Sequence, residues 1–142
     1  MNEDKWSSAT LRINSKYRST ADISRLLKTE PSRSVEKGSR LSWSNQNSAV
    51  SEENCWLLES GLADSEPLEA HVTKLVSFIE QNISTLKGLL ADCDIEMLCA
   101  FASGTSQGGV VLHAELLKRL TALPVNLIID LYPPEEKSAT LQ

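Results

Sequence analysis

Residues 65–92 read SEPLEAHVTKLVSFIEQNISTLKGLLAD, and this stretch carries the clearest structural pattern in the chain. Apolar residues recur in it every three or four positions, a spacing that lines one face of an α-helix. An apolar stripe of this length must be buried. The pattern therefore predicts a helix from Ser65 to Asp92 that packs on a hydrophobic core through Leu68, Val72, Leu75, Val76, Ile79, Ile83, Leu86 and Leu90.

Both the start and the middle of this helix carry local signals. Ser65 is the expected N-cap, followed by Glu66 and Pro67, which suit a first helical turn. Asn82 and Ser84 compete with helical hydrogen bonds through their own side chains. We therefore expect the helix to kink or restart at residues 82–84.

The remaining segments predict strands and shorter helices around the long helix. Helices are expected after Ser19 or Thr20, ending by Pro31, and at 114–123. Alternation of apolar and polar residues predicts strands at 6–15, 55–60, 94–103 and 124–132, with short strands at 110–112 and near 41–44. This order predicts an α+β fold, a mostly antiparallel sheet with helices packed on one face, related to the ferredoxin-like fold.

Length and composition predict one domain. The 142 residues, 41% hydrophobic and 23% charged, suit a single globular body over 1–132. A long Ser-rich loop is expected at 30–53, of the kind that often binds a partner or moves. Residues 133–142, which begin Pro-Pro-Glu-Glu, are expected to form a disordered tail.

Charge and cysteine content narrow the function classes. A net charge of −5 argues against binding to nucleic acid or to an anionic membrane, and it permits a basic protein partner. No apolar run reaches the roughly 18 residues of a membrane helix, and no signal peptide is visible. The three cysteines form no CxxC pair, so reduced thiols in a cytoplasmic protein are expected.

A series of short motifs runs along the chain. The motifs are Glu30-Pro31-Ser32 with Lys37-Gly38, Trp56-x-Leu58, Ser65-x-Pro67-Leu68-Glu69-x-His71, Gly108-Gly109-x-x-Leu112, Glu115-Leu116-Leu117 and Ile128-x-Asp130-x-Tyr132. In this order they resemble one uncharacterised, mainly bacterial family, DUF4279. They span nearly the whole chain, which supports one domain. His113 departs from the Ser-like cap that the family has at that position. The family supplies no known activity, so the resemblance implies no catalytic residue.

No set of residues predicts catalysis, a metal or a cofactor. His71 is expected at a boundary or on the surface, and His113 at a helix cap. Cys99 falls on an apolar strand face, which argues against a zinc site with Cys93. The loop at 103–109 lacks the Lys and the following helix of a phosphate loop, so a flexible turn is expected.

Two features retain functional interest. The first is the face of the sheet away from the helices, which is either a solvated surface with cross-strand charge pairs or a surface for a partner. The second is the long loop, which contains Arg33 and Trp43. Trp43 either tucks under the loop or stands exposed as an interface anchor. The candidate partner surface comprises Arg12, Leu57, Glu59, Glu96, Leu98, Ile128, Asp130 and Tyr132 on the sheet, with Arg33 and Trp43 in the loop.

Three hypotheses follow for the function. The first is a non-catalytic cytoplasmic domain that binds a protein, one form of which is a toxin-neutralising immunity protein. The second is a regulatory domain that senses a small molecule in a pocket between sheet and loop. The third is an enzyme that uses Glu59, Glu96 and Asp130, and it requires at least one of these carboxylates to be buried with a raised pKa.

Overall fold

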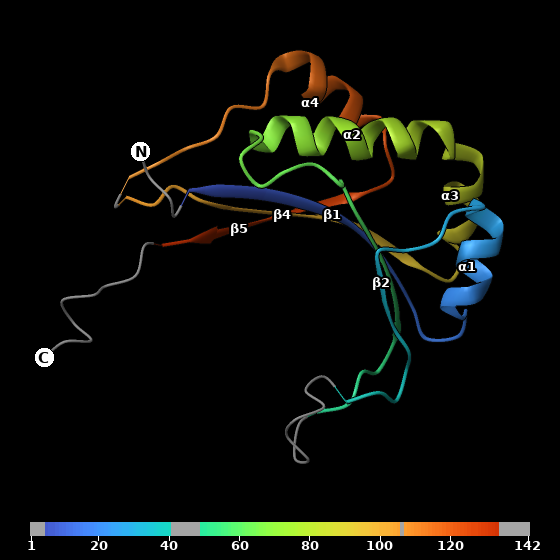
Figure 1. Ribbon diagram of the computed structural model, residues 1–142. Coiled ribbons are helices and arrows are strands. Elements are labelled where there is room, and N and C mark those ends of the chain that lie inside the picture. The colour runs from blue at the N-terminus through green and yellow to red at the C-terminus, as the bar shows by residue number, and fades with distance from the viewer. Residues whose placement is uncertain (1–4, 41–48, 106, 134–142) are drawn as a thin grey trace, which may run out of the picture.

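The computed structural model describes residues 5–40, 49–105 and 107–133. Its elements are, in chain order, β1 (Trp6–Ser15), α1 (Thr20–Leu27), β2 (Arg33–Val35), β3 (Asn54–Glu59), α2 (Leu68–Gln81), α3 (Ile83–Leu89), β4 (Asp94–Ala102), α4 (Ala114–Thr121) and β5 (Asn126–Tyr132). Figure 1 shows the helices gathered on one side of the sheet. The predicted α+β class, with helices on one face of a mostly antiparallel sheet, is confirmed.

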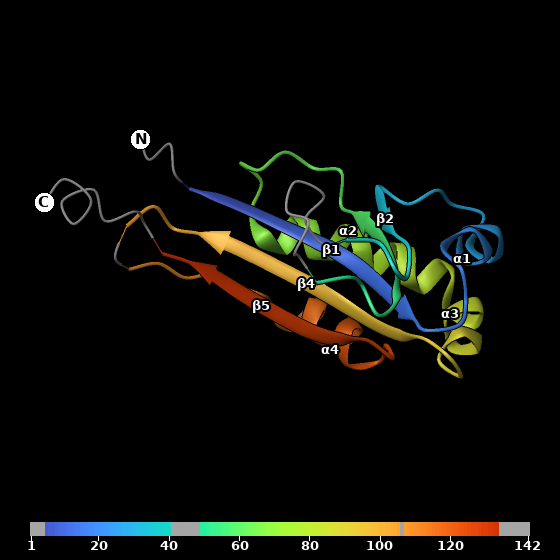
Figure 2. The ribbon, with the colours of Figure 1, turned by 90° about the horizontal axis from the view of Figure 1, so that it is seen from below.

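The sheet has the strand order β2-β3-β1-β4-β5. The pairs β1–β3, β1–β4 and β2–β3 are antiparallel. These four strands, with α1 and α2 between them, reproduce the ferredoxin-like βαββαβ arrangement. α4 then leads to β5, which lies parallel to β4 at the end of the sheet (Figure 2). The molecule is therefore a ferredoxin-like sheet with one added parallel strand.

The core lies between the sheet and α1, α2 and α3. Strict alternation along β1 turns Ala9, Leu11 and Ile13 toward the helices, where each is almost completely buried. Trp56 on β3 joins them, its indole N–H donating to Ser24 Oγ on α1 at 2.9 Å. Its ring stacks near Phe78 of α2, with 6.5 Å between centroids. The helix-facing alternation predicted for 6–15, 55–60 and 94–103 is thus confirmed at these strands.

The predicted helix 65–92 is two helices, as its central polar residues indicate. Asn82 ends α2, and its side-chain amide donates to the Phe78 carbonyl at 2.9 Å, the same carbonyl that accepts the Asn82 backbone N–H at 3.2 Å. The predicted N-cap at Ser65 is wrong. Pro67 occupies the capping position in an extended conformation, and the helix begins at Leu68 without a side-chain cap. Leu90, predicted to be buried, is 42% exposed beyond the end of α3, and Leu89 is buried instead.

Other expectations differ in detail. Residues 110–112 form no strand, and Val111 is exposed in the segment that leads to α4. The expected loop at 30–53 contains the short strand β2, and its described ends pair through an Arg40–Val50 bridge. The expected strand near 41–44 and the expected tail from 134 onward lie outside the described residues. No helix in the described ranges is long and apolar enough to cross a bilayer.

Candidate functional site

Among the described residues, one face of the sheet carries no helix (Figure 1). The strand register places the predicted partner residues of the strands on this face. We call it the open face. The strand register orders it into cross-strand rows. These rows are Trp6–Ala102–Tyr132, Ser8–Ala100–Asp130, Glu59–Thr10–Leu98–Ile128 and Arg33–Leu57–Arg12–Glu96–Asn126.

An ion pair occupies the middle of the open face. Arg12 on β1 donates to Glu96 Oε1 on β4 from Nη2 at 2.5 Å and from Nε at 3.0 Å. The Asn14 amide reaches the same oxygen at 3.4 Å. The Arg12 side chain keeps 31% of its surface exposed and the Glu96 side chain 19%. The pair is therefore fixed in orientation by two strands and still accessible from solvent.

An aromatic pair lies at one end of the open face. The rings of Trp6 and Tyr132 approach to 5.1 Å between centroids with an interplanar angle of 52°. They come from β1 and β5 and lie on either side of Ala102 of β4, which they cover. Tyr132 remains half exposed. This end of the face thus offers aromatic surface of the kind enriched at protein interfaces.

The other predicted partner residues differ in exposure. Leu98 and Ile128 are half-buried neighbours in one row. Leu57 lies on the open face as expected, but it is buried, flanked in the register by Arg12 and Arg33. Leu57 is therefore part of the packing, while its arginine neighbours form the surface. Trp43 lies outside the described residues.

The three carboxylates considered for catalysis do not come together. Glu59, Glu96 and Asp130 belong to three different rows of the open face. Glu59 and Asp130 are exposed, and Glu96 is paired with Arg12. The register therefore places no two of these carboxylates directly opposite each other on neighbouring strands.

His71 is buried, so the prediction that it lies at a boundary or on the surface is wrong. It is 1% exposed, and its Nδ1 lies 2.6 Å from Ser60 Oγ at the end of β3. Among the described residues its Nε2 has no hydrogen-bond partner. The spacing of Leu68, His71 and Leu75 places all three on one face of the helix. This spacing indicates a buried His71, although histidine is polar.

His113 lies at the N-cap position of α4, as predicted, but the sequence did not predict its contact with Glu69. It is the N-cap residue, and its Nδ1 lies 2.7 Å from Glu69 Oε1 on α2. The other oxygen of Glu69 accepts the His113 backbone N–H. These bonds hold the pKa of Glu69 below its usual value. The His113 side chain makes no capping bond to α4, so Glu69 ties the start of α4 to α2 through the N-cap residue itself.

A cleft of about 630 Å³ lies beside this contact, between the start of β1, the start of α2 and the segment before α4. Its lining combines apolar Trp6, Leu68 and Val110 with Glu69 and His113. A volume of this size with a few polar groups is within the range of small-molecule sites. It lies beside residues 109–113, not beside the 30–53 loop.

The thiols are free and do not meet. Burial raises the pKa values of Cys99 and Cys93 to about 11, and burial also raises the pKa of Cys55. Within the described ranges, no three His, Cys, Asp or Glu side chains are grouped so as to hold a metal ion.

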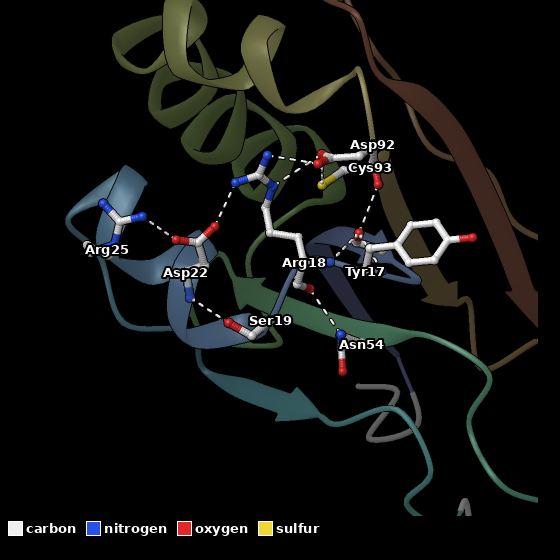
Figure 3. A network of polar contacts seen from close by, with 9 residues as sticks. Tyr17, Arg18, Ser19, Asp22, Arg25, Asn54, Asp92 and Cys93 are labelled. Atoms are coloured by element: carbon white, nitrogen blue, oxygen red, sulfur yellow. Dashed lines mark hydrogen bonds and ion pairs between the residues drawn. The ribbon is translucent and has the colours of Figure 1, made fainter.

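Arg18 organises a polar network at the edge of the core (Figure 3). Its guanidinium bonds Asp92 before β4 at 2.8 Å and Asp22 of α1 at 2.6 Å, and Asp22 also pairs with Arg25. Its carbonyl accepts the Asn54 amide at 3.0 Å. The network joins three chain segments, and each charge in it has a partner. It is therefore best explained as a structural tie.

Comparison with protein families matches residues 4–134 to the family described as "Domain of unknown function (DUF4279)". The chain belongs to this family, as its motifs indicated. Comparison with curated proteins and with solved structures found no match.

Proposed function

We propose that this member of the family is a non-catalytic domain that binds a protein through the open face. The observation that carries the proposal is the open face, which combines an accessible Arg12–Glu96 ion pair with the Trp6–Tyr132 aromatic pair. Aromatic residues and arginine are enriched at interfaces and at their hot spots. An oriented charge pair adds specificity, because a partner that sets a like charge against Arg12 or Glu96 is disfavoured.

The chain's charge supports a basic partner. The net charge of −5 favours encounter with a cationic surface. Exposed Glu59 lies in the same row of the open face as Leu98 and Ile128, and exposed Asp130 lies in the next row, on the same strand as Ile128. Neutralisation of a basic bacterial toxin is one specific form of such binding, in a cytoplasmic setting. It predicts that co-expression of the chain restores growth to cells that produce the toxin encoded beside it.

The experiment is capture of partners from a bacterial lysate by the wild-type chain and by open-face variants, with quantitative mass spectrometry. Arg12→Glu places two acids opposite each other, and Tyr132→Ala removes half of the aromatic pair. The matched control is Lys74→Glu, a charge reversal at an exposed position of α2 in the helix layer. We expect one protein to be lost with both open-face variants and retained by the control. A captured protein that depends on Lys74 but not on Arg12 or Tyr132 would refute the proposal.

A second function is favoured by the cleft near Glu69 and His113. A regulatory domain that senses a small molecule would use its apolar lining for the body of the ligand and these two polar groups for orientation. A saturating ligand at about 100 times its Kd would stabilise the fold by roughly 2.7 kcal/mol. A thermal-shift screen of amphipathic metabolites tests this alternative, with Val110→Trp as the variant that fills the cleft. A hit that is unaffected by Val110→Trp would place the ligand elsewhere.

A further inference from the structure

The free edge of β5 is the most apolar strand surface that the structure leaves exposed. β5 ends the sheet order, so in the described part of the chain its outer edge has no strand partner. Its residues 126–132 include one charge, Asp130. Exposed sheet edges in natural proteins are usually protected by charges, prolines or bulges, because their unpaired backbone groups recruit other strands. The edge of β5 lacks this protection along its length.

The side of β5 that faces the helices is also left partly uncovered. Leu127, Ile129 and Leu131 share their face and register with Met97, Cys99 and Phe101 of β4. Met97 and Cys99 are buried, whereas their β5 neighbours are 39%, 49% and 63% exposed. α4 instead packs against α2, where Arg119 pairs with Glu80 at 2.8 Å. The inward direction predicted for these β5 residues is confirmed, but their burial is not.

We propose that a second copy of this chain covers this edge, through antiparallel pairing of β5 with β5 about a two-fold axis at Ile129. An axis perpendicular to the sheet keeps the helices of both copies on one side. It then sets Ile129 against Ile129 and Leu127 against Leu131. A two-fold centre at Asp130 would oppose two like charges directly, which destabilises a strand pair. With the centre at Ile129, each Asp130 lies opposite Ile128 of the other copy.

The buried area suits a reversible dimer. At about 200 Å² for a fully exposed large apolar side chain, the exposed parts of Leu127, Ile129, Leu131 and Tyr132 amount to roughly 400 Å² per copy. This is an upper limit, because these side chains project from the faces of the sheet and pairing covers only part of each. Two copies, with the backbone edges added, therefore reach at most about 1,000 Å², the lower limit of specific interfaces. The pairing also satisfies the unpaired N–H and C=O groups of both edges. The product is a continuous sheet that joins the two five-stranded sheets edge to edge.

Sedimentation equilibrium of the full chain tests this pairing. We expect the mean mass to rise toward twice the monomer mass between about 1 μM and about 1 mM, the range of weak and transient interfaces. Ile129→Lys should weaken dimerisation by at least about tenfold. Leu90→Lys, at a similarly exposed leucine beyond α3, should leave it unchanged. Circular dichroism and melting of each variant verify the fold.

A cysteine at the two-fold centre tests the register. Residues opposite each other in an antiparallel pair have Cα atoms about 4.5–5.5 Å apart, within the span of a disulfide. Ile129→Cys should therefore give an oxidised dimer, and Leu90→Cys should not. A chain that stays monomeric across the range would overturn the proposal, as would association that Ile129→Lys does not weaken. A monomer is also the expected result if a strand of another protein, or the chain's own residues after 133, occupies this edge. The open-face variants Arg12→Glu and Tyr132→Ala are scored by partner capture, so failure of the dimer leaves the proposed function standing.

Discussion

Replacement of Ser60 by Ala should destabilise the protein by about 1–3 kcal/mol, the usual cost of leaving a buried polar group without its hydrogen bond. Ser60 Oγ accepts the Leu62 N–H at 3.3 Å and lies 2.6 Å from His71 Nδ1. The hydroxyl oxygen has two lone pairs, so it either donates to Nδ1 or accepts from it, depending on the tautomer of His71. In either tautomer, His71 Nε2 has no hydrogen-bond partner among the described residues.

Ser60→Ala leaves both nitrogens of a buried imidazole unpaired. For a chain of this size, roughly 4 °C of melting temperature corresponds to 1 kcal/mol, so a fall of about 4–12 °C is expected. His71→Leu removes the orphaned Nε2 together with the bond, so its effect should be within about 1 kcal/mol. In the double variant Ser60→Ala/His71→Leu, loss of the Ser60 hydroxyl no longer leaves an imidazole unpaired. The two changes should therefore couple favourably by at least about 1 kcal/mol.

Urea unfolding followed by tryptophan fluorescence measures all four free energies of unfolding. Ser65→Ala serves as the control, because Ser65 is exposed just before α2 and its loss should change stability by no more than about 0.5 kcal/mol. If Ser60→Ala proves as mild as this control, or if the two changes are additive, the buried bond does not contribute as argued.

Two further predictions concern titration. Hydrogen bonds from Arg18 to Asp92, and from Arg25 and Arg18 to Asp22, hold the pKa values of both carboxyls below the ordinary 3.8. Their stabilisation is therefore present above that pH and lost as pH falls through the lowered values, so the melting-temperature gap between wild type and Arg18→Met should shrink between pH 7 and pH 3. An unchanged gap would contradict this. With pKa values of about 11, Cys93 and Cys99 hold only about one part in a thousand of thiolate at pH 8. Half-buried Cys55 should react first with Ellman's reagent, as read by mass spectrometry of the labelled peptides, and early labelling of Cys99 would show that its strand opens.

Alternation and helical periodicity made the layers of this fold predictable, because they report directly on which side of an element a residue lies. The helix-side residues of β1 and β4, and the restart of the long helix at Asn82, follow from such local patterns. The N-cap could not be read in the same way. Ser65 and Pro67 both suit a helix start, and only the extended backbone at Pro67 decides between them.

Sequence patterns did not predict the properties that depend on what packs against a strand or helix. Alternation placed Ile129 on the helix side of β5, but it carries no information on whether a helix covers that side. The bond between Glu69 and His113 joins residues 44 positions apart, and no local sequence pattern predicts it. On the open face, the register brought Arg12 and Glu96 together as the alternation allowed, while the burial of Leu57 depends on how three strands pack.

The attachment of β5 has a consequence for the order in which the protein assembles on the ribosome. The strands from β1 to β4, with α1 and α2, precede α4 and β5 in the chain, and their pairing does not require β5. A nascent chain can therefore complete its ferredoxin-like part before α4 and β5 have emerged from the ribosome. We expect β5 to add last, to a border that β4 already presents, and to be the first strand to detach when the protein is pulled from its C-terminus.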